Sequence, residues 1–341
     1  MNQIVKLSTC LAVLLIVSMS SGLAQDLHFS QFFNSPLTTN PANTGFIPDG
    51  NYRLGINYRD QWTSVPVPYR TMSAYGDFQL FRDQLEYGWV GIGGVLLRDV
   101  AGAGNLTSTK GYASIAYHQL LGFSSLLSAG FNVGSAGKRV DITKLTFADQ
   151  WNGKFFDSQI PTGEPITSSS VNYFDLQAGL NYAYFPNDNI YVNAGFSVQH
   201  INTPRETFFD GNNTVPRRYI GFLNASLKMS DKVILNPAAY YATQAGAREL
   251  MLGANAAYNL SGDGVQQLYG GLYYRANDAA IFLVGYQINA IKLMFNYDIT
   301  TSSLSAANNR RGAYELGVVF TGLYSNRSFN NARRSTICPS F

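Results

Sequence analysis

The sequence predicts an all-β fold, a transmembrane antiparallel up-and-down β-barrel of about fourteen strands with a short N-terminal segment outside the strands. Three observations support this prediction. Only 13% of the 341 residues are charged, whereas 14% are aromatic. After residue 24 no apolar run reaches the roughly 18 residues that a transmembrane helix needs. From about residue 51, apolar and polar residues alternate in segments that turn residues separate, which is typical of strands with two different faces.

The composition also excludes other classes of protein. A chain with 22 Tyr, 22 Phe and a net charge of only +3 has ample surface to bury, so it is not disordered. Its 24 Lys and Arg form no long basic stripe, and we therefore expect no nucleic-acid partner. Cys10 and Cys338 are the two cysteines, and we expect only Cys338 to remain after export, most simply as a passive thiol.

Residues 1–24 are predicted to be a secretory signal peptide, because Lys6 precedes an apolar run that leads to small residues and Ala24. Cleavage is expected before Gln25. Cys10 lies ahead of the apolar run, so it does not fit the lipidated cysteine of a lipoprotein. This segment predicts export, and with the barrel it predicts an integral protein of the outer membrane of a Gram-negative bacterium.

Residues 25–50 are predicted to form a periplasmic or plug segment rather than a strand. They contain Ser35-Pro36 and Asn40-Pro41, and proline cannot donate to a sheet ladder and favours turns. Two placements are open at this point. The segment either enters the lumen or lies across the periplasmic mouth of the barrel.

Residues 51–321 are predicted to form the barrel. In its clearest strand, Leu176, Leu180 and Tyr182 share one face, while Asp175 and Gln177 lie on the other. The expected strands lie near residues 51–59, 71–81, 87–98, 108–121, 125–140, 172–184, 190–199, 218–228, 234–244, 249–260, 267–274, 279–287, 291–297 and 313–321. Connections after even-numbered strands are all tight, whereas most of those after odd-numbered strands are long. A rim of turns and a rim of loops is typical of outer-membrane barrels.

Charged residues give an independent test, because a Lys or Arg that faces lipid at mid-depth costs roughly 2–4 kcal/mol. Seven charged residues share the phase of the polar, glycine-rich face: Arg53, Arg59, Asp77, Asp175, Glu249, Lys292 and Glu315. Tyrosines concentrate near strand ends, which is typical of aromatic girdles at the membrane interfaces. We therefore expect the uncharged face to contact the lipid bilayer.

The loops carry candidate partner-binding residues. Residues 98–104 form a glycine-rich turn that includes Asp99, without the lysine of a phosphate-binding loop. The loop 141–171 contains Trp151, Phe155 and Phe156, and loops this long are often functional. Exposed aromatic residues there would suit a protein partner, and a loop folded inward as a plug is the equal alternative.

Residues 322–341 are predicted to form a C-terminal periplasmic tail. Its small basic cluster of Arg327, Arg333 and Arg334 either meets acidic partners or is a solvated chain end.

No catalytic or cofactor motif is present in the sequence, so we expect a non-enzymatic protein without a cofactor or metal. His28, His118 and His200 lie on separate segments and lack the spacing of a zinc helix. His118 shares phase with Tyr112 and Ser114, which makes it the best residue for an assembled hydrolase site. A satisfied polar residue on the barrel wall is the simpler interpretation.

The chain after the predicted signal peptide opens with DLHFSQFFNSPLTTNPANTG at 26–45, which contains a candidate plug motif of His28, Phe29, Gln31, Asn40 and Pro41. This opening resembles the start of the PorP/SprF family of the type IX secretion system in Bacteroidetes. Further similar segments are GINYRDQW, RDVAGAG, LTFADQW, LNPAAYYATQAGAREL, GAYELG and the terminal CPSF. Tyr314 and Phe295-Asn296 depart from the family pattern, although they lie outside the opening and closing segments.

The resemblance implies an outer-membrane component of type IX secretion that supports the secretion or surface attachment of a cargo such as a gliding adhesin. The implied partners are other secretion components and a cognate secreted surface protein. A FadL-like transporter of hydrophobic small molecules is the alternative, because those barrels also have fourteen strands and an N-terminal plug with an Asn-Pro-Ala element. Asn40-Pro41-Ala42 fits that alternative too.

Overall fold

The structure is a computed structural model, and it describes residues 27–324 except 63–68, 83, 158, 165–167, 209–210 and 263. The predicted signal peptide, its cleavage site, the tail beyond residue 324 and Cys338 lie outside the described residues. In the part of the chain that is described, no helix combines the length and apolarity needed to cross a membrane.

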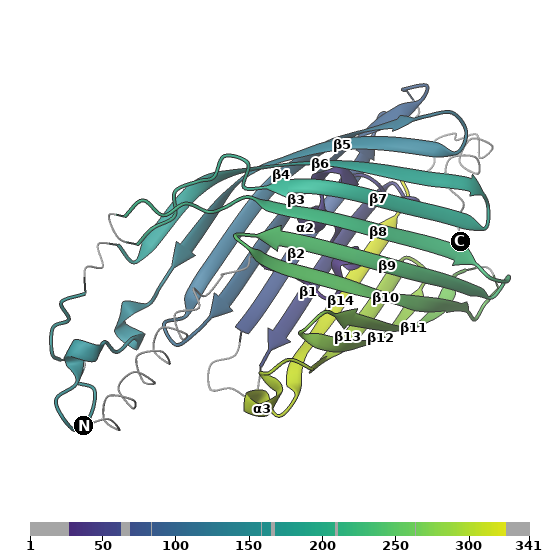
Figure 1. Cartoon of the computed structure of the whole chain (residues 1–341). Helices are drawn as coiled ribbons and strands as arrows, with labels where there is room; N and C mark the ends of the chain where they lie inside the picture. The colour runs from purple at the N-terminus through teal and green to yellow at the C-terminus, as the bar shows by residue number, and fades with distance from the viewer. Residues whose placement is uncertain are drawn as a thin grey trace, which may run out of the picture.

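The described residues form a closed antiparallel barrel of fourteen strands in which sequence neighbours pair and β1 pairs with β14 (Figure 1). This confirms the predicted fold class. The strands are β1 (Tyr52–Gln61), β2 (Tyr69–Leu80), β3 (Gly88–Ala101), β4 (Leu106–Leu120), β5 (Ser125–Arg139), β6 (Ser170–Asn187), β7 (Ile190–Gln199), β8 (Arg218–Lys228), β9 (Val233–Gln244), β10 (Ala247–Asn259), β11 (Gln266–Arg275), β12 (Ala279–Ile288), β13 (Ile291–Thr300) and β14 (Arg311–Gly322).

The two ends of the barrel differ in the length of their connections. The connections that follow even-numbered strands, such as β2–β3 and β4–β5, lie at one end of the barrel, which we call the turn rim. We call the opposite end the loop rim. The connection from β5 to β6 is the longest one of the loop rim and contains η3 (Ile142–Lys144) and η4 (Ala148–Gln150). The connection from β13 to β14 contains α3 (Ser305–Asn308). This difference follows the predicted alternation of tight turns and longer loops.

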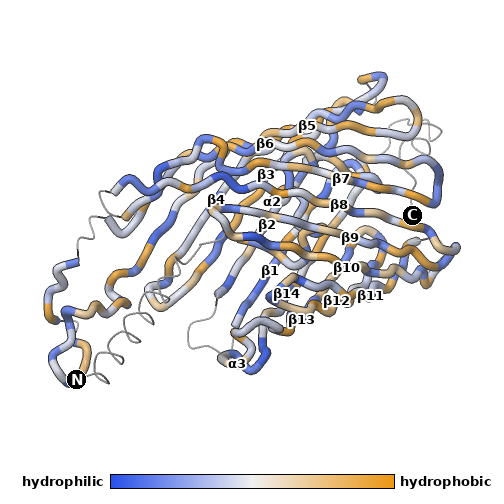
Figure 2. The backbone as a smooth tube through the Cα atoms, viewed as in Figure 1, coloured by the Kyte–Doolittle hydropathy of each residue, from blue (hydrophilic) through white to orange (hydrophobic). Residues whose placement is uncertain are grey.

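The outer face of the barrel is apolar. Large hydrophobic side chains such as Ile56, Leu96 and Leu272 are exposed at 61%, 65% and 61%. The residues beside them along the strands point inward, and many of these are polar or small, such as Asn57 and Gly271, so hydropathy changes repeatedly along the strands (Figure 2). An exterior of this kind is stable in lipid, because a closed barrel leaves no unpaired backbone edge in the hydrocarbon.

Residues 27–50, which we call the lumenal segment, lie inside the barrel. The segment contains three short helices: η1 (Phe32–Asn34), α2 (Pro36–Thr39) and η2 (Pro41–Asn43). Pro36 and Pro41 each begin a helix, where the missing N–H costs nothing. Of the two placements that the sequence leaves open, the structure has the segment within the lumen.

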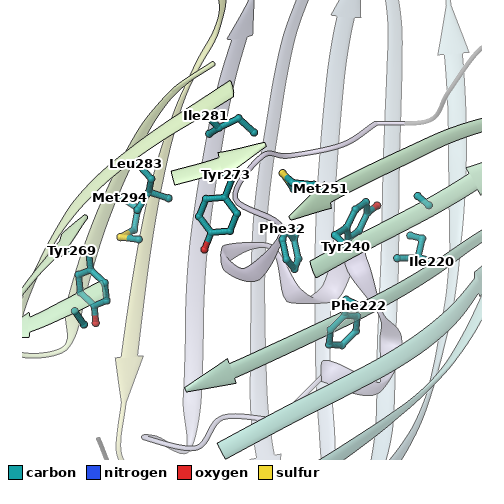
Figure 3. Packing of buried hydrophobic residues seen from close by; sticks show 12 residues of the cluster. Phe32, Ile220, Phe222, Tyr240, Met251, Tyr269, Tyr273, Ile281, Leu283 and Met294 are labelled. Carbon is teal, nitrogen blue, oxygen red and sulfur yellow. The ribbon is translucent and has the colours of Figure 1, made fainter. Parts of the chain in front are cut away.

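Each of the three apolar clusters of the interior contains one phenylalanine of the lumenal segment. Phe29, Phe32 and Phe46 are only 4–6% exposed and contact different parts of the wall. Figure 3 shows Phe32 beside Tyr240 and Met251, which come from β9 and β10. Because burying a Phe side chain contributes roughly 1.5–3 kcal/mol, these contacts hold the segment on several sides.

Candidate functional site

The strongest concentration of chemistry lies where the start of the lumenal segment meets the loop-rim half of the wall. Six charged side chains gather there and form what we call the arginine–carboxylate cluster: Arg59, Arg218, Arg275, Glu249, Asp298 and Glu315. All six are buried, and they come from β1, β8, β10, β11, β13 and β14. The formal charges cancel, so the cluster needs no counter-ion.

Ser30 lies at the centre of this cluster. Its hydroxyl donates to Asp298 across 2.8 Å, and it accepts from Arg59 and Arg275, each across 2.7 Å. Its backbone N–H donates to Glu315 Oε2 across 2.9 Å. The next backbone N–H, of Gln31, donates to the other oxygen of Glu315 across 3.0 Å. Ser30 alone is thereby bonded to four strands, β1, β11, β13 and β14.

His28 is held as a neutral imidazole. Arg275 donates from Nη1 to His28 Nε2 across 2.9 Å, and because a guanidinium only donates, Nε2 has to be unprotonated. Burial lowers the pKa of His28 well below its usual value, and Arg275, Arg59 and Arg218 lower it further. Glu249 lies 4.0 Å from Nδ1, the remaining nitrogen.

A second attachment joins the end of the lumenal segment to β1 and β2. Asp77 accepts the backbone N–H of Gly45 across 2.8 Å and forms an ion pair with Arg53 at 2.7 Å. Arg53 also donates to the carbonyl of Asn43 across 3.3 Å. Charged residues that the sequence assigns to the inward face thus bind the segment directly.

Asn40 and Pro41 contact the barrel wall at two positions that are occupied by glycine, Gly179 and Gly130. The amide of Asn40 donates to the carbonyl of Leu180 across 2.8 Å, and its oxygen accepts the N–H of Ala42 across 2.8 Å. A Cβ atom on Gly179 would lie 1.9 Å from the Asn40 side chain, and one on Gly130 would lie 2.4 Å from Pro41. The lumenal segment can therefore approach the wall this closely only because glycine, which has no Cβ atom, stands at both positions.

His118 is a fully bonded residue of the wall. One ring nitrogen lies 2.8 Å from the carbonyl of Thr44, and the other lies 2.7 Å from Ser128 Oγ. The ring stacks on Trp89 at 4.7 Å between centroids. Ser114, the serine that shares the phase of His118 on β4, is bonded to Thr44. The structure does not bring His118 and Ser114 together as a catalytic pair.

The aromatic residues of the β5–β6 connection are exposed on a hairpin that projects beyond the loop rim (Figure 1). Trp151 pairs with Phe156, and their rings meet edge to face at 5.0 Å. Trp151, Phe155 and Phe156 are 49%, 58% and 49% exposed. The inward-folded alternative for these side chains is therefore wrong.

Asp99, the fourth candidate partner residue, lies on β3 and accepts a hydrogen bond from Thr71 across 2.6 Å. It lies on the barrel wall and not on the projecting hairpin.

Sequence reasoning missed the pairing of His200 with Asp175. Both side chains are fully buried, and His200 Nδ1 lies 3.0 Å from Asp175 Oδ2. His200 directly follows β7 and has a positive φ of 56°. The sequence offered one sign of this pairing, a polar residue at the end of a predicted strand. Among residues 27–324 as described, no group of three or more His, Cys, Asp or Glu side chains is arranged to hold a metal ion.

A closed fourteen-strand barrel with an apolar exterior and an N-terminal segment bonded inside its lumen defines a membrane β-barrel protein. The sequence matches the family of type IX secretion system membrane proteins PorP/SprF over residues 21–320, and the chain belongs to that family. The recognition made from the sequence is confirmed. A comparison with curated proteins finds no match.

Solved structures of similar fold include hydrocarbon channels. The Pseudomonas putida toluene transporter TodX is 10% identical, with a TM-score of 0.50 over 87% of this chain and 94% of that one. A Pseudomonas aeruginosa FadL homologue is also 10% identical, with a TM-score of 0.50 over 84% and 94%. A TodX mutant described as a monoaromatic hydrocarbon channel reaches 0.52 at 11% identity over 84% and 93%. At these identities the likeness concerns the fold alone.

Proposed function

We propose that this protein is a non-enzymatic outer-membrane component of type IX secretion that supports the secretion or surface attachment of a particular cargo protein. The observation that carries the proposal is membership in the PorP/SprF family over residues 21–320. In this proposal the loop rim faces the cell exterior and the turn rim faces the periplasm, as in other single-chain outer-membrane barrels.

The lumen of such a protein does not conduct the cargo. A barrel of fourteen strands is narrower than a folded protein, and here the lumenal segment fills much of it. Ser30, Gly45 and Asn40 bond to separate parts of the wall, so the segment is fixed along its length. The protein would then act as a docking component, with the exposed hairpin of Trp151, Phe155 and Phe156 as the surface for a secreted partner.

Affinity purification tests this role. The tagged barrel is extracted from membranes of cells that secrete by the type IX route, and the co-purified proteins are identified by mass spectrometry. We expect other type IX components and one surface protein, such as a gliding adhesin. A preparation that contains the barrel without any secretion component or surface protein would contradict the proposal.

The alternative is a FadL-like transporter of hydrophobic small molecules. It draws on the fold shared with TodX, but several inward side chains in the lumen are amides, such as Asn236 and Gln267, which bind hydrocarbons poorly. Deletion of the gene separates the two roles. A transporter predicts loss of uptake of one hydrophobic substrate with normal secretion, whereas the proposed role predicts lost surface display with normal uptake.

A further inference from the structure

A chamber of about 260 Å³ lies inside the barrel on the turn-rim side of the lumenal segment. Its wall comes from strands β8 to β13, and Phe33, Asn34 and Asp49 of the lumenal segment also line it. Gln267 and Lys292 lie within two residues of the turn-rim ends of β11 and β13. The chamber is therefore separate from the arginine–carboxylate cluster, which lies toward the loop rim.

The lining of the chamber is polar but carries almost no charge. Six side-chain amides line it: Asn34, Asn224, Asn236, Asn255, Gln267 and Gln287. The charged lining residues are Asp49 and Lys292, whose formal charges cancel. A hydrocarbon would leave these amides without hydrogen-bond partners, and an ion would find no net charge to pair with. A neutral polar ligand suits this lining best.

Unused donors surround the ring of Tyr269. Its hydroxyl donates to Gln267 Oε1 across 2.6 Å and lies 3.0 Å from Gln287 Oε1. The amino groups of both glutamines have no protein partner among the described residues. Lys292 Nζ lies 5.1 Å from the centre of the same ring. One aromatic ring is thus flanked by three groups that can donate to a ligand.

A chain of hydrogen bonds also orders the part of the chamber wall that β8 to β11 form. Ser226 donates to Asn236 across 2.7 Å, Asn236 donates to Asn255 across 3.0 Å, and Asn255 donates to the hydroxyl of Tyr273 across 2.7 Å. Figure 3 shows the hydroxyls of Tyr269 and Tyr273 pointing the same way, away from Ile281. The polar groups are therefore oriented before any ligand arrives, which lowers the entropy cost of binding.

We propose that this chamber binds a short neutral saccharide. Each hydroxyl of a sugar is both a donor and an acceptor, as is each side-chain amide, so the two sets of groups match. The ring of Tyr269 offers an apolar face for the C–H groups of a sugar ring, whereas Phe33 already stacks on the ring of Tyr273 at 5.7 Å between centroids. An extended peptide is less favoured, because peptides bind sheets by adding a strand to a free edge, and a closed barrel has none. The proposal does not depend on the role in secretion.

Isothermal titration calorimetry on the full-length exported protein tests this site. The protein is kept in an alkyl polyoxyethylene detergent, since maltoside detergents carry a sugar that would compete. The probes are maltotriose, cellotriose and chitotriose, with trialanine and laurate for the two other ligand classes. We expect saturable binding of at least one trisaccharide and none of trialanine or laurate. Failure of all three trisaccharides, or tighter binding of trialanine or laurate, would overturn the proposal.

Variants locate the binding within the chamber. Gln267→Leu and Gln287→Leu each remove one unused donor, and we expect each to weaken saccharide binding about tenfold. Ala238→Trp fills the chamber without removing a polar group, and we expect it to abolish binding. Gln119→Leu is the matched control, because Gln119 lies on the outer face of β4 near the same rim.

Heat-dependent migration in gels shows which variants form the closed barrel, and only folded variants are compared. Saccharide binding that survives Ala238→Trp in a folded barrel would overturn the assignment of the site.

Discussion

Arg275 donates a hydrogen bond to Nε2 of His28 across 2.9 Å, and this contact joins the start of the lumenal segment to the end of β11. It exists only while His28 is neutral, because a protonated imidazole has no acceptor to offer. Protonation would also place a fourth positive charge beside Arg59, Arg218 and Arg275, with Glu249, Asp298 and Glu315 as the opposing carboxylates.

Acid should therefore loosen the start of the lumenal segment. The pKa of His28 is lowered in the folded protein, while in the released segment it returns to its usual value of about 6.5. The released state then binds more protons, so docking is weakened progressively as the pH falls below about 6.5. Hydrogen exchange of the Ser30 and Gln31 amides measures this opening. We expect faster exchange at pH 5 than the intrinsic rate change explains.

His28→Asn is the control for this pH effect. Asparagine can accept from Arg275 through its side-chain oxygen but does not titrate. If wild type and variant lose protection in parallel between pH 7.5 and pH 5, His28 does not control docking.

Glu315 should be indispensable for docking, because it accepts the N–H groups of Ser30 and Gln31 and pairs with Arg59 at 3.2 Å. Glu315→Gln leaves a buried guanidinium short of a partner, and breaking a buried pair costs about 3–5 kcal/mol. We expect residues 27–34 to become accessible to protease while the barrel still forms.

The double variant Glu315→Gln/Arg59→Met separates the ion pair from the rest of the cluster. Removing both partners leaves less uncompensated charge, so its effect should be smaller than the sum of the two single effects. Strict additivity in the protease assay would show that the two side chains do not act as a pair.

Gly179 should not tolerate a methyl group. Its Cβ would lie 1.9 Å from the oxygen of the Asn40 side chain, so Gly179→Ala has to displace the lumenal segment. We expect a loss of about 1–3 kcal/mol in the stability of the docked segment, as for other overpacked sites. Gly270→Ala is the matched control, since a Cβ there meets no atom within 4 Å. Equal denaturation midpoints for the two variants would contradict the close packing.

The barrel could be predicted from the sequence because its determinants are local. Side chains alternate with a period of two along each strand, so residues such as Leu180 and Asp175 reveal their faces without knowledge of the partner strand. Turn residues then mark where each strand ends. The predicted strands consequently lie within about three residues of those in the structure.

The contacts of the lumenal segment could not be predicted in the same way. Ser30 meets Glu315 across 285 positions of sequence, and the stagger of all fourteen strands decides which side chains arrive at that point. Gly179 offered a partial signal, because an inward glycine indicates a close approach without saying of what. The donors around Tyr269 likewise become a group only when β11, β12 and β13 are placed side by side.

The hairpin that carries Phe155 provides the sharpest test of the proposed docking role. Its side chain is 58% exposed, and the hairpin backbone is held by bonds that do not involve the ring: Asn152 accepts the N–H groups of Lys154 and Phe155 through its side chain, each across 3.0 Å. Phe155→Ala should therefore leave the fold intact. Because exposed aromatic residues dominate binding energy at protein interfaces, we expect recovery of the secreted surface protein to fall at least tenfold.

Phe123→Ala is the matched control, since Phe123 is 97% exposed but lies on the turn rim. Quantitative mass spectrometry of proteins captured with each tagged variant measures the difference. If Phe123→Ala lowers recovery of the cargo and Phe155→Ala does not, the docking surface lies at the turn rim and the proposed orientation is reversed.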